Sequence, residues 1–377
     1  MRTTVGAGRD GGTSGGASGG TSRMRRRSMA VLGVLAVAFA ATLTACSTGG
    51  DDDEAAGGAG QGSGSFPVTM EHVYGETEIR EKPERIVTIG WITHDIVAAL
   101  GTAPVGVDET WGGDDEGFSP WFREQVENVI GGDMPELTDS DDGSINIEKI
   151  AATEPDLILA PHSGVTDVDY GRLSDIAPTV AYRESPWQSG SWQELTETVA
   201  TALGERERGR ELIEETETAM EREAAKHPNL DGASFVYGLT FEGGSQELGL
   251  YVAGDPRVAF LREFGLVDAP GLAGSMDLED EDSFFGTVSL ENIGRVETDL
   301  FVGWSSSREQ TSDTLETPAI SRWEPVEEGN YYILEDETLA SATNGPSPLS
   351  IRWALDEGFL EDLSEAVDGG AVVRSAR

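Results

Sequence analysis

The sequence predicts an α/β protein built from two similar lobes, and three features of the 377-residue chain support this class. First, the segment 145–160 aligns without gaps onto the segment 288–303. Second, short apolar runs alternate with helical patterns on either side of the chain's middle. Third, a long helical stretch separates the two sets of apolar runs. Two α/β lobes with a helical connector follow from this arrangement.

The internal repeat is the strongest of these features. Glu148 aligns with Glu291, and Leu157 aligns with Leu300. Each copy is expected to form an amphipathic helix, a short turn and a continuous apolar strand. Strands without polar alternation are typical of parallel sheets that are covered on both faces. The repeat therefore predicts one such sheet in each lobe.

The remaining apolar runs fit the same plan. They lie at 86–89, 105–107, 179–182, 235–239, 251–253 and 331–334. The helical stretch begins near Ser191, is interrupted at Gly204, and continues from Glu205 to Lys226 over about 33 Å. Its apolar face is thin, which suits either a stiff connector that crosses both lobes or a short, solvated pair of helices.

The N-terminal residues indicate export. Arginines 25–27 precede an apolar run from Met29 to Leu43, which is too short to span a bilayer and is typical of a signal peptide. The run ends in Leu43-Thr44-Ala45-Cys46, which resembles the bacterial lipobox. We expect lipidation at Cys46, because the alternative of a buried cysteine requires folded sequence around it. Translation starts at either Met1 or Met24.

The sequence predicts five segments. They are a leader and lipoprotein signal peptide (1–45), a flexible tether of Gly, Ala, Ser and acidic residues (46–65), an N-terminal lobe (66–190), a helical connector (191–227) and a C-terminal lobe (228–377). Beyond residue 45 there remain 20 basic and 68 acidic residues, a net charge of −48. So negative a chain is not expected to bind nucleic acid.

Several motifs together resemble the binding proteins of iron-siderophore and cobalamin ABC importers, over about 74–363. These motifs are Lys-Pro-Glu-Arg-Ile-Val at 82–87, the segment 100–107, Ile-Glu at 147–148 with Pro-Asp-Leu-Ile at 155–158, the segment 173–179, and Val-Ser-Leu-Glu at 288–291. The resemblance implies two Rossmann-like lobes joined by one long rigid α-helix, with the ligand cleft between them. It also implies that Glu148 and Glu291 dock onto arginines of the permease.

Ligand-contacting residues are expected just after the apolar runs, because the carboxyl ends of parallel strands border the crevice of an open α/β sheet. The candidates are Trp91, His94, Trp111, His162, Arg183 and Trp187 from the first lobe and Phe241, Tyr251, Trp304 and Arg308 from the second. Each of these side chains has packing as its alternative role. His94 and His162 lack the spacing of a metal site, so no metal ligands are predicted.

These residues suit a bulky, partly polar ligand such as a ferric siderophore, whose organic shell requires ring faces and whose oxygens require donors. A hydroxamate type is favoured, since a highly anionic catecholate complex calls for more basic residues. A cobalamin- or haem-binding protein is the alternative, and an exported enzyme is the least favoured. We expect a monomer without a cofactor, anchored to the cell membrane, whose partners are the ABC permease and its ATPase.

Overall fold

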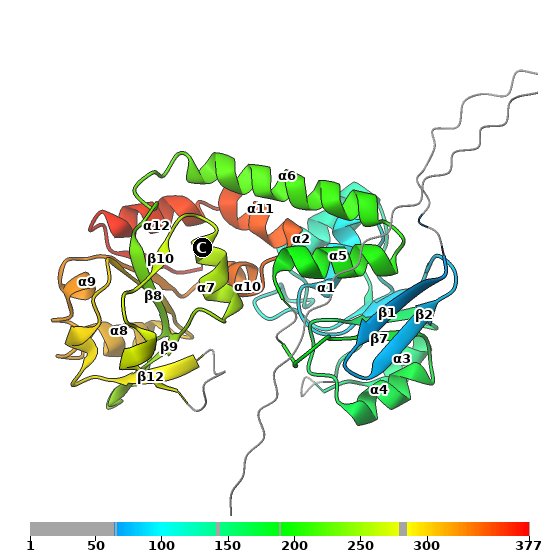
Figure 1. The fold of residues 1–377 in the computed structure, drawn as a ribbon, viewed down its shortest axis with the longest axis horizontal. Helices are drawn as coiled ribbons and strands as arrows, with labels where there is room; N and C mark the ends of the chain where they lie inside the picture. The colour runs from blue at the N-terminus through cyan, green and yellow to red at the C-terminus, as the bar shows by residue number, and fades with distance from the viewer. Residues whose placement is uncertain (1–63, 65, 141–143, 188–189, 279–284, 377) are drawn as a thin grey trace, which may run out of the picture. The chain divides into compact units, whose positions relative to one another are not determined.

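The computed structural model describes residues 64, 66–140, 144–187, 190–278 and 285–376 (Figure 1). The leader, Cys46 and nearly all of the tether lie outside the described residues. Residues 60–377 belong to one compact unit. No helix in the described part of the chain is long and apolar enough to cross a membrane.

The first lobe is built on a five-stranded, all-parallel sheet in the order β5-β4-β3-β6-β7. Its strands are β3 (Ile86–Thr88), β4 (Gly106–Val107), β5 (Glu136–Leu137), β6 (Leu157–Ala160) and β7 (Thr179–Ala181). Every residue of β3, β6 and β7 is buried. The predicted parallel sheet is therefore confirmed in this lobe.

The helices of the first lobe follow these strands. They are α1 (Thr93–Ala99), α2 (Pro120–Glu124) with its π-helical continuation η1 (Gln125–Ile130), α3 (Ile147–Ala152) and α4 (Asp167–Ser174). An antiparallel hairpin of β1 (Val68–His72) and β2 (Gly75–Ile79), which the sequence patterns did not predict, precedes the sheet. Alternate residues of β1 are buried, so one face of the hairpin packs on the lobe.

The second lobe has an eight-stranded sheet, ordered β11-β12-β9-β8-β13-β14-β15 with β10 paired to β8. Its strands are β8 (Ser234–Leu239), β9 (Glu247–Tyr251), β10 (Val267–Asp268), β11 (Asp277–Leu278), β12 (Phe285–Ser289), β13 (Leu300–Trp304), β14 (Tyr331–Leu334) and β15 (Val372–Arg374). The neighbours β8, β13, β14 and β15 are parallel, whereas β9, β11 and β12 add an antiparallel edge. The strand predicted at 251–253 was wrong in position, because β9 ends at Tyr251.

The helix predicted in the second repeat copy was also wrong. In the first copy, the side chain of Asn146 accepts a hydrogen bond from the amide of Lys149 and so caps the N-terminus of α3. The corresponding Ser289 is the last residue of β12, paired with β9, and is followed only by the 3₁₀ turn η3 (Ile293–Arg295). Gly294 also replaces Ala151, which disfavours a helix by about 1 kcal/mol. The strands that end the two copies, β6 and β13, form as predicted.

The connector consists of α5 (Trp192–Ala202) and α6 (Arg206–Ala224), with the predicted interruption at Gly204. Helix α5 packs through Leu195 and Val199 into the hydrophobic core of the first lobe. Helix α6 extends roughly 28 Å and runs over α5 and α11 (Pro348–Asp356) in Figure 1. Leu212, Thr216 and Met220 are buried on its thin apolar face.

The remaining helices of the second lobe are α7 (Pro256–Arg262), α8 (Arg308–Glu316), α9 (Glu324–Glu327), α10 (Glu337–Asn344) and α12 (Phe359–Val367), with the 3₁₀ turn η2 (Ala273–Ser275). Helix α11 also packs against α1 and α2 of the first lobe. At this contact, Trp121 lies 5.1 Å from Trp353 between ring centroids. The lobes are thus joined by packing at α11 as well as by the connector.

Candidate functional site

Aromatic side chains gather where the strands of the first sheet end. Trp91 follows β3, His162 follows β6, and Trp187 lies in the segment after β7. The ring centroids of Trp91 and Trp187 are 6.1 Å apart, and those of His162 and Trp187 are 5.9 Å apart with the rings edge to face. Trp91 is 42% exposed and Trp187 is 45% exposed. Exposed indoles in such a cluster present a large apolar surface for a ligand.

The backbone around this cluster is strained. Ile92 has φ 59° and Trp187 has φ 62°, in the left-handed region that non-glycine residues rarely adopt. Such conformations cost roughly 1–3 kcal/mol each and concentrate at binding sites. The amide of Trp187 donates to the carbonyl of Ser163, and a Cβ on Gly164 would lie 2.8 Å from the indole Nε1 of Trp187. The glycine therefore allows this tryptophan to lie close to the chain after β6.

A second aromatic pair joins the two lobes. Trp111 lies in the loop after β4, and Trp304 is the last residue of β13. Their ring centroids are 5.5 Å apart at an angle of 77°. The buried Nε1 of Trp304 has no hydrogen-bond partner among the described residues. Buried indole N–H groups usually find an acceptor, so this donor is suited to a polar ligand atom or a water molecule.

Arg257 is the principal cationic group on the second-lobe side, and the sequence analysis missed it. It lies in the first turn of α7, where its amide donates a hydrogen bond to the carboxylate of Asp255, the N-cap of the helix. Its Nη1 donates to Asp255 at 2.8 Å, and its guanidinium carbon lies 4.4 Å from the ring centroid of Tyr251. The Arg257 side chain is 21% exposed. Its remaining donors are thus held in a fixed orientation without complete burial.

The surroundings of His162 include a positive charge from the second lobe. Burial, followed by the positive charge of Arg257, lowers the pKa of His162 to about 4. His162 is therefore neutral at pH 7 and can offer a hydrogen bond without adding a charge. Its buried Nδ1 has no partner among the described residues. A first-lobe histidine and a second-lobe arginine thus share one environment.

Beside His162 lies a hollow of about 370 Å³, hereafter the inter-lobe crevice. Its lining comes from both lobes: Ile92, His162, Glu184, Gly190, Ser191, Trp192 and Leu195 from the first lobe and α5, and Gly254, Pro256, Ala259, Phe260, Glu263, Asn344, Gly345 and Pro346 from the second. Arg257 does not line the crevice, although the preceding residue Pro256 does. Ile92 and Gly345 also line a smaller hollow of about 30 Å³, which contains Trp91, His94, Trp111 and Ser341. The crevice lies where ligands bind in α/β proteins.

A larger hollow of about 670 Å³ lies elsewhere, between α6 and α11. Five acidic side chains line it, Glu211, Glu214, Glu215, Glu223 and Asp356, and none of the aromatic candidates does. It is not at the carboxyl ends of the strands. The inter-lobe crevice is therefore the better candidate, despite its smaller volume.

The predicted residue His94 is a buried packing group. His94 is 5% exposed within α1, where it meets Phe122 edge to face at 4.9 Å. Burial lowers the pKa of His94, although the neighbouring Asp95 opposes this shift. No group of three or more His, Cys, Asp or Glu in the described residues is arranged to hold a metal ion. His94 therefore borders the small hollow as a neutral side chain.

Six predicted residues line neither of the two hollows: Arg183, Trp187, Phe241, Tyr251, Trp304 and Arg308. Arg183 is exposed after β7, and Phe241 packs against the core on one side of the second sheet. The Arg308 side chain is 83% exposed at the start of α8, with its Nε 3.9 Å from Glu335. Helix α8 turns this arginine to solvent, so proximity to the end of β13 did not bring it into the crevice. Tyr251 reaches the site through its contact with Arg257.

The paired glutamates of the repeat lie on the surface. Glu148 is exposed in the first turn of α3, and Glu291 is exposed in the turn between β12 and η3. Neither forms an ion pair within the described parts of the chain. Both carboxylates are therefore accessible to a partner.

A two-lobed α/β fold with a crevice lined from both lobes defines a solute-binding protein. Residues 86–338 match the family model described as periplasmic binding protein, and the chain belongs to this family. Membership of this family makes the chain a binding protein and not an enzyme.

Named relatives extend over most of the chain. The Fe(3+)-citrate-binding protein YfmC of Bacillus subtilis (strain 168) is 21% identical over 318 residues, which cover 84% of this chain and 92% of that protein. The structure of Streptococcus pneumoniae TIGR4 PiaA in complex with ferrichrome is 31% identical, with a TM-score of 0.72, and covers 80% of this chain and 99% of that chain. Staphylococcus aureus SirA complexed with staphyloferrin B shares the fold, with 21% identity, a TM-score of 0.60, and coverage of 80% of this chain and 98% of that chain.

Proposed function

We propose that this protein is an extracytoplasmic lipoprotein, anchored at Cys46, that binds a ferric siderophore and delivers it to an ABC permease for iron uptake. The observation that carries the proposal is the crevice that His162 and Trp192 line from one side and Phe260 and Asn344 line from the other, with Trp187 packed against His162. The aromatic surfaces suit the organic shell of a siderophore, and Arg257, which follows the lining residue Pro256, suits an exposed oxygen that bears partial negative charge. The oxygens of the siderophore already coordinate the iron, which therefore needs no protein ligand.

The charges around the crevice favour a hydroxamate siderophore. Arg257 is already paired with Asp255, and Glu184 and Glu263 are among the lining residues. An uncharged ferric hydroxamate fits this lining better than a ferric catecholate, whose several negative charges would meet these carboxylates. The names of the relatives agree with a ferric ligand, since YfmC is a Fe(3+)-citrate-binding protein and PiaA was crystallised with ferrichrome, itself a hydroxamate siderophore.

The test is a titration of residues 47–377 with ferrichrome, a ferric catecholate, cobalamin and haem, followed by tryptophan fluorescence. We expect ferrichrome to quench the fluorescence with a submicromolar Kd, because Trp192 lines the crevice, Trp91 lines the adjoining small hollow, and the exposed Trp187 packs against His162. The catecholate complex is expected to bind more weakly. The absence of submicromolar binding to any ferric hydroxamate would refute the hydroxamate assignment, and tight binding of cobalamin or haem alone would replace the siderophore.

Delivery to the permease is proposed to use Glu148 and Glu291, which occupy equivalent positions in the repeat and are exposed. Changing both to glutamine is expected to slow siderophore-dependent iron uptake by cells about tenfold, since two inter-protein ion pairs are lost. The Kd for ferrichrome should not change. Uptake of radioactive iron and the isolated Kd are measured side by side.

The repeat itself supplies a matched control. Glu154 and Glu297 also occupy equivalent positions and are exposed. The Glu154→Gln, Glu297→Gln double variant is expected to import iron at the wild-type rate. Equal uptake by the two double variants would remove the docking role of Glu148 and Glu291 while leaving ligand binding intact.

A further inference from the structure

The loop from Asp108 to Phe118, hereafter the Trp111 loop, connects the first lobe to the second. It begins after β4 and contacts the start of α10, where Thr338 Oγ1 donates to the carbonyl of Gly112 at 2.7 Å. Gly112 has φ +73°, and a Cβ at this position would lie 2.4 Å from the carbonyl oxygen of Glu337. The close approach requires glycine and fixes the loop against the second lobe.

This contact places Trp111 beside Trp304. The neighbouring Gly112 anchors the backbone on α10, and the Trp111 ring meets Trp304 edge to face at 5.5 Å. Trp111 also lines the small hollow. This hollow adjoins the crevice, because Ile92 and Gly345 line both. The conformation of the Trp111 loop therefore sets the position of an aromatic side chain at the ligand site.

The loop has an internal framework of hydrogen bonds. The amide of Thr110 donates to the carbonyl of Gly117 at 2.8 Å, and the amide of Asp114 donates to the carbonyl of Phe118 at 2.9 Å. The Asp114 Oδ1 atom accepts from the amides of Glu116 and Phe118 at 2.9 and 3.2 Å. Asp114 is thus the centre of the loop's polar contacts.

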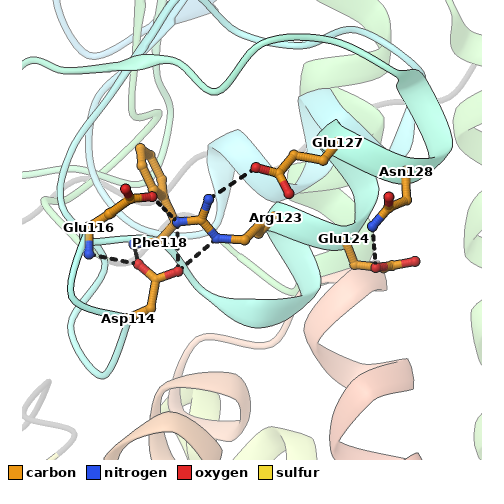
Figure 2. A network of polar contacts seen from close by, with 7 residues as sticks. All are labelled: Asp114, Glu116, Phe118, Arg123, Glu124, Glu127 and Asn128. Atoms are coloured by element: carbon orange, nitrogen blue, oxygen red, sulfur yellow. Dashed lines mark hydrogen bonds and ion pairs between the residues drawn. The ribbon is translucent and has the colours of Figure 1, made fainter.

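Arg123 of α2, which lies outside the ligand site, pairs with Asp114, as Figure 2 shows. Its Nε donates to Asp114 at 2.7 Å, its Nη2 to Glu116 at 2.8 Å, and its Nη1 to Glu127 at 3.1 Å. Its guanidinium carbon also lies 5.3 Å from the ring centroid of Phe118. One side chain therefore contacts three residues of the loop and anchors them to a helix.

The electrostatics agree with this geometry. Partial burial would raise the pKa of Asp114, but the amide of Phe118 and the guanidinium of Arg123 hold that pKa below its ordinary value. The Arg123 side chain is 24% exposed, which is less than any of its three carboxylate partners. The arginine is thus the most enclosed member of the ion-pair network.

We propose that Arg123 is a positioning residue for ligand binding: it holds the Trp111 loop in the conformation that keeps Trp111 against Trp304. The residue itself does not touch the ligand. This inference rests on the proposed function, since it assumes that the ligand occupies the crevice beside these tryptophans.

The test compares Arg123→Met and Arg123→Lys with the wild type by ferrichrome titration. The methionine variant is expected to bind about tenfold more weakly, because several partly exposed ion pairs are lost together. The lysine variant keeps the charge without the guanidinium fork and should retain intermediate affinity. Arg208→Met is the matched control, since Arg208 also pairs with two glutamates, Glu211 and Glu215, but lies on α6. It should bind like the wild type.

Amide hydrogen exchange of the unliganded proteins supplies a readout that does not depend on the ligand. Faster exchange is expected at Thr110, Gly113, Asp114 and Gly117 in Arg123→Met, without a matching increase in the core strands. Unchanged exchange at these amides, or wild-type affinity in a variant whose loop exchanges faster, would overturn the proposal. If the wild type binds no ferric siderophore, the proposed function fails, whereas the exchange data still decide whether Arg123 holds the loop.

Discussion

Replacing Arg257 with glutamine is expected to weaken ferric-siderophore binding about 100-fold, the largest effect on affinity that we predict for one side chain. Hydrogen bonds to charged groups contribute roughly 1.5–3 kcal/mol, and a 100-fold change corresponds to about 2.7 kcal/mol. Arg257 is oriented before the ligand arrives, because Asp255 and the face of Tyr251 hold its guanidinium. Little ordering of this side chain is therefore required on binding.

Glutamine is chosen because Asp255 is itself buried. Burial raises the pKa of Asp255, while Arg257 opposes this shift, so complete removal of the donor would leave a carboxylate without a partner. A glutamine amide still donates a hydrogen bond but carries no charge. Urea unfolding of the variant, measured alongside the titration, verifies that the affinity refers to folded protein.

Arg308→Gln is the matched control for this experiment. Both arginines lie in the first turn of a second-lobe helix, but the Arg257 side chain is 21% exposed and follows Pro256 at the crevice, whereas the Arg308 side chain is 83% exposed. It is expected to bind ferrichrome within about twofold of the wild type. An Arg257→Gln variant that binds as tightly as Arg308→Gln would show that the guanidinium does not contact the ligand.

The second large effect concerns stability and lies at the contact between the lobes. Asp95 is 2% exposed, and its Oδ2 accepts hydrogen bonds at 2.7 Å from Trp121 Nε1 and from Ser347 Oγ. Trp121 belongs to α2 of the first lobe, and Ser347 caps α11 of the second. Trp121→Phe with Ser347→Ala removes both donors and is expected to lower the free energy of unfolding by about 4 kcal/mol at pH 8.

The loss of unfolding free energy in this double variant is expected to depend on pH. Burial raises the pKa of Asp95, so the folded protein holds this proton more tightly than the unfolded chain does. The stability linked to this proton is present below the unfolded pKa near 3.8 and is lost as the pH rises through the folded pKa. Removing both donors raises the folded pKa further. The difference between variant and wild type should therefore be smaller at pH 5 than at pH 8.

Trp323→Phe controls for the loss of an indole donor in a buried site. Its Nε1 donates to the neutral carbonyl of Val296 at 2.8 Å, far from any lobe contact in the core of the second lobe. Urea unfolding should show a loss of about 1–2 kcal/mol with no difference between pH 5 and pH 8. If the double variant also loses the same free energy of unfolding at pH 5 and at pH 8, the loss does not arise from Asp95.

Local patterns predicted the parts of the fold that depend on neighbouring residues. Uninterrupted apolar runs predicted β6 and β13, because a strand buried on both faces has no polar side to alternate. The break at Gly204 also followed from sequence, since glycine there adopts φ +70° between α5 and α6. The helix of the second repeat copy failed because Ser289, the position corresponding to the cap of α3, is paired in β12.

The candidate site was predictable only on one side. Trp91, His162 and Trp187 follow strands of a simple parallel sheet, whose carboxyl ends meet at one edge. The second sheet has an antiparallel edge, so residues after its strands do not all reach one place, and Arg308 lies outside the hollows. Arg257 lies in the first turn of α7, and nothing in the local sequence predicted that its charge would act on His162 of the other lobe.

The sequence by itself thus determined the class of fold, and it named His162 among the residues that line the crevice. Only the tertiary structure decided which groups meet across the lobes, such as Trp111 with Trp304 and Asp95 with Ser347. The physical reason is the separation along the chain over which each effect acts. Periodicity and capping act over a few neighbouring residues, whereas each of these contacts joins residues that are distant in the chain and depends on how the two sheets are placed by α6 and α11.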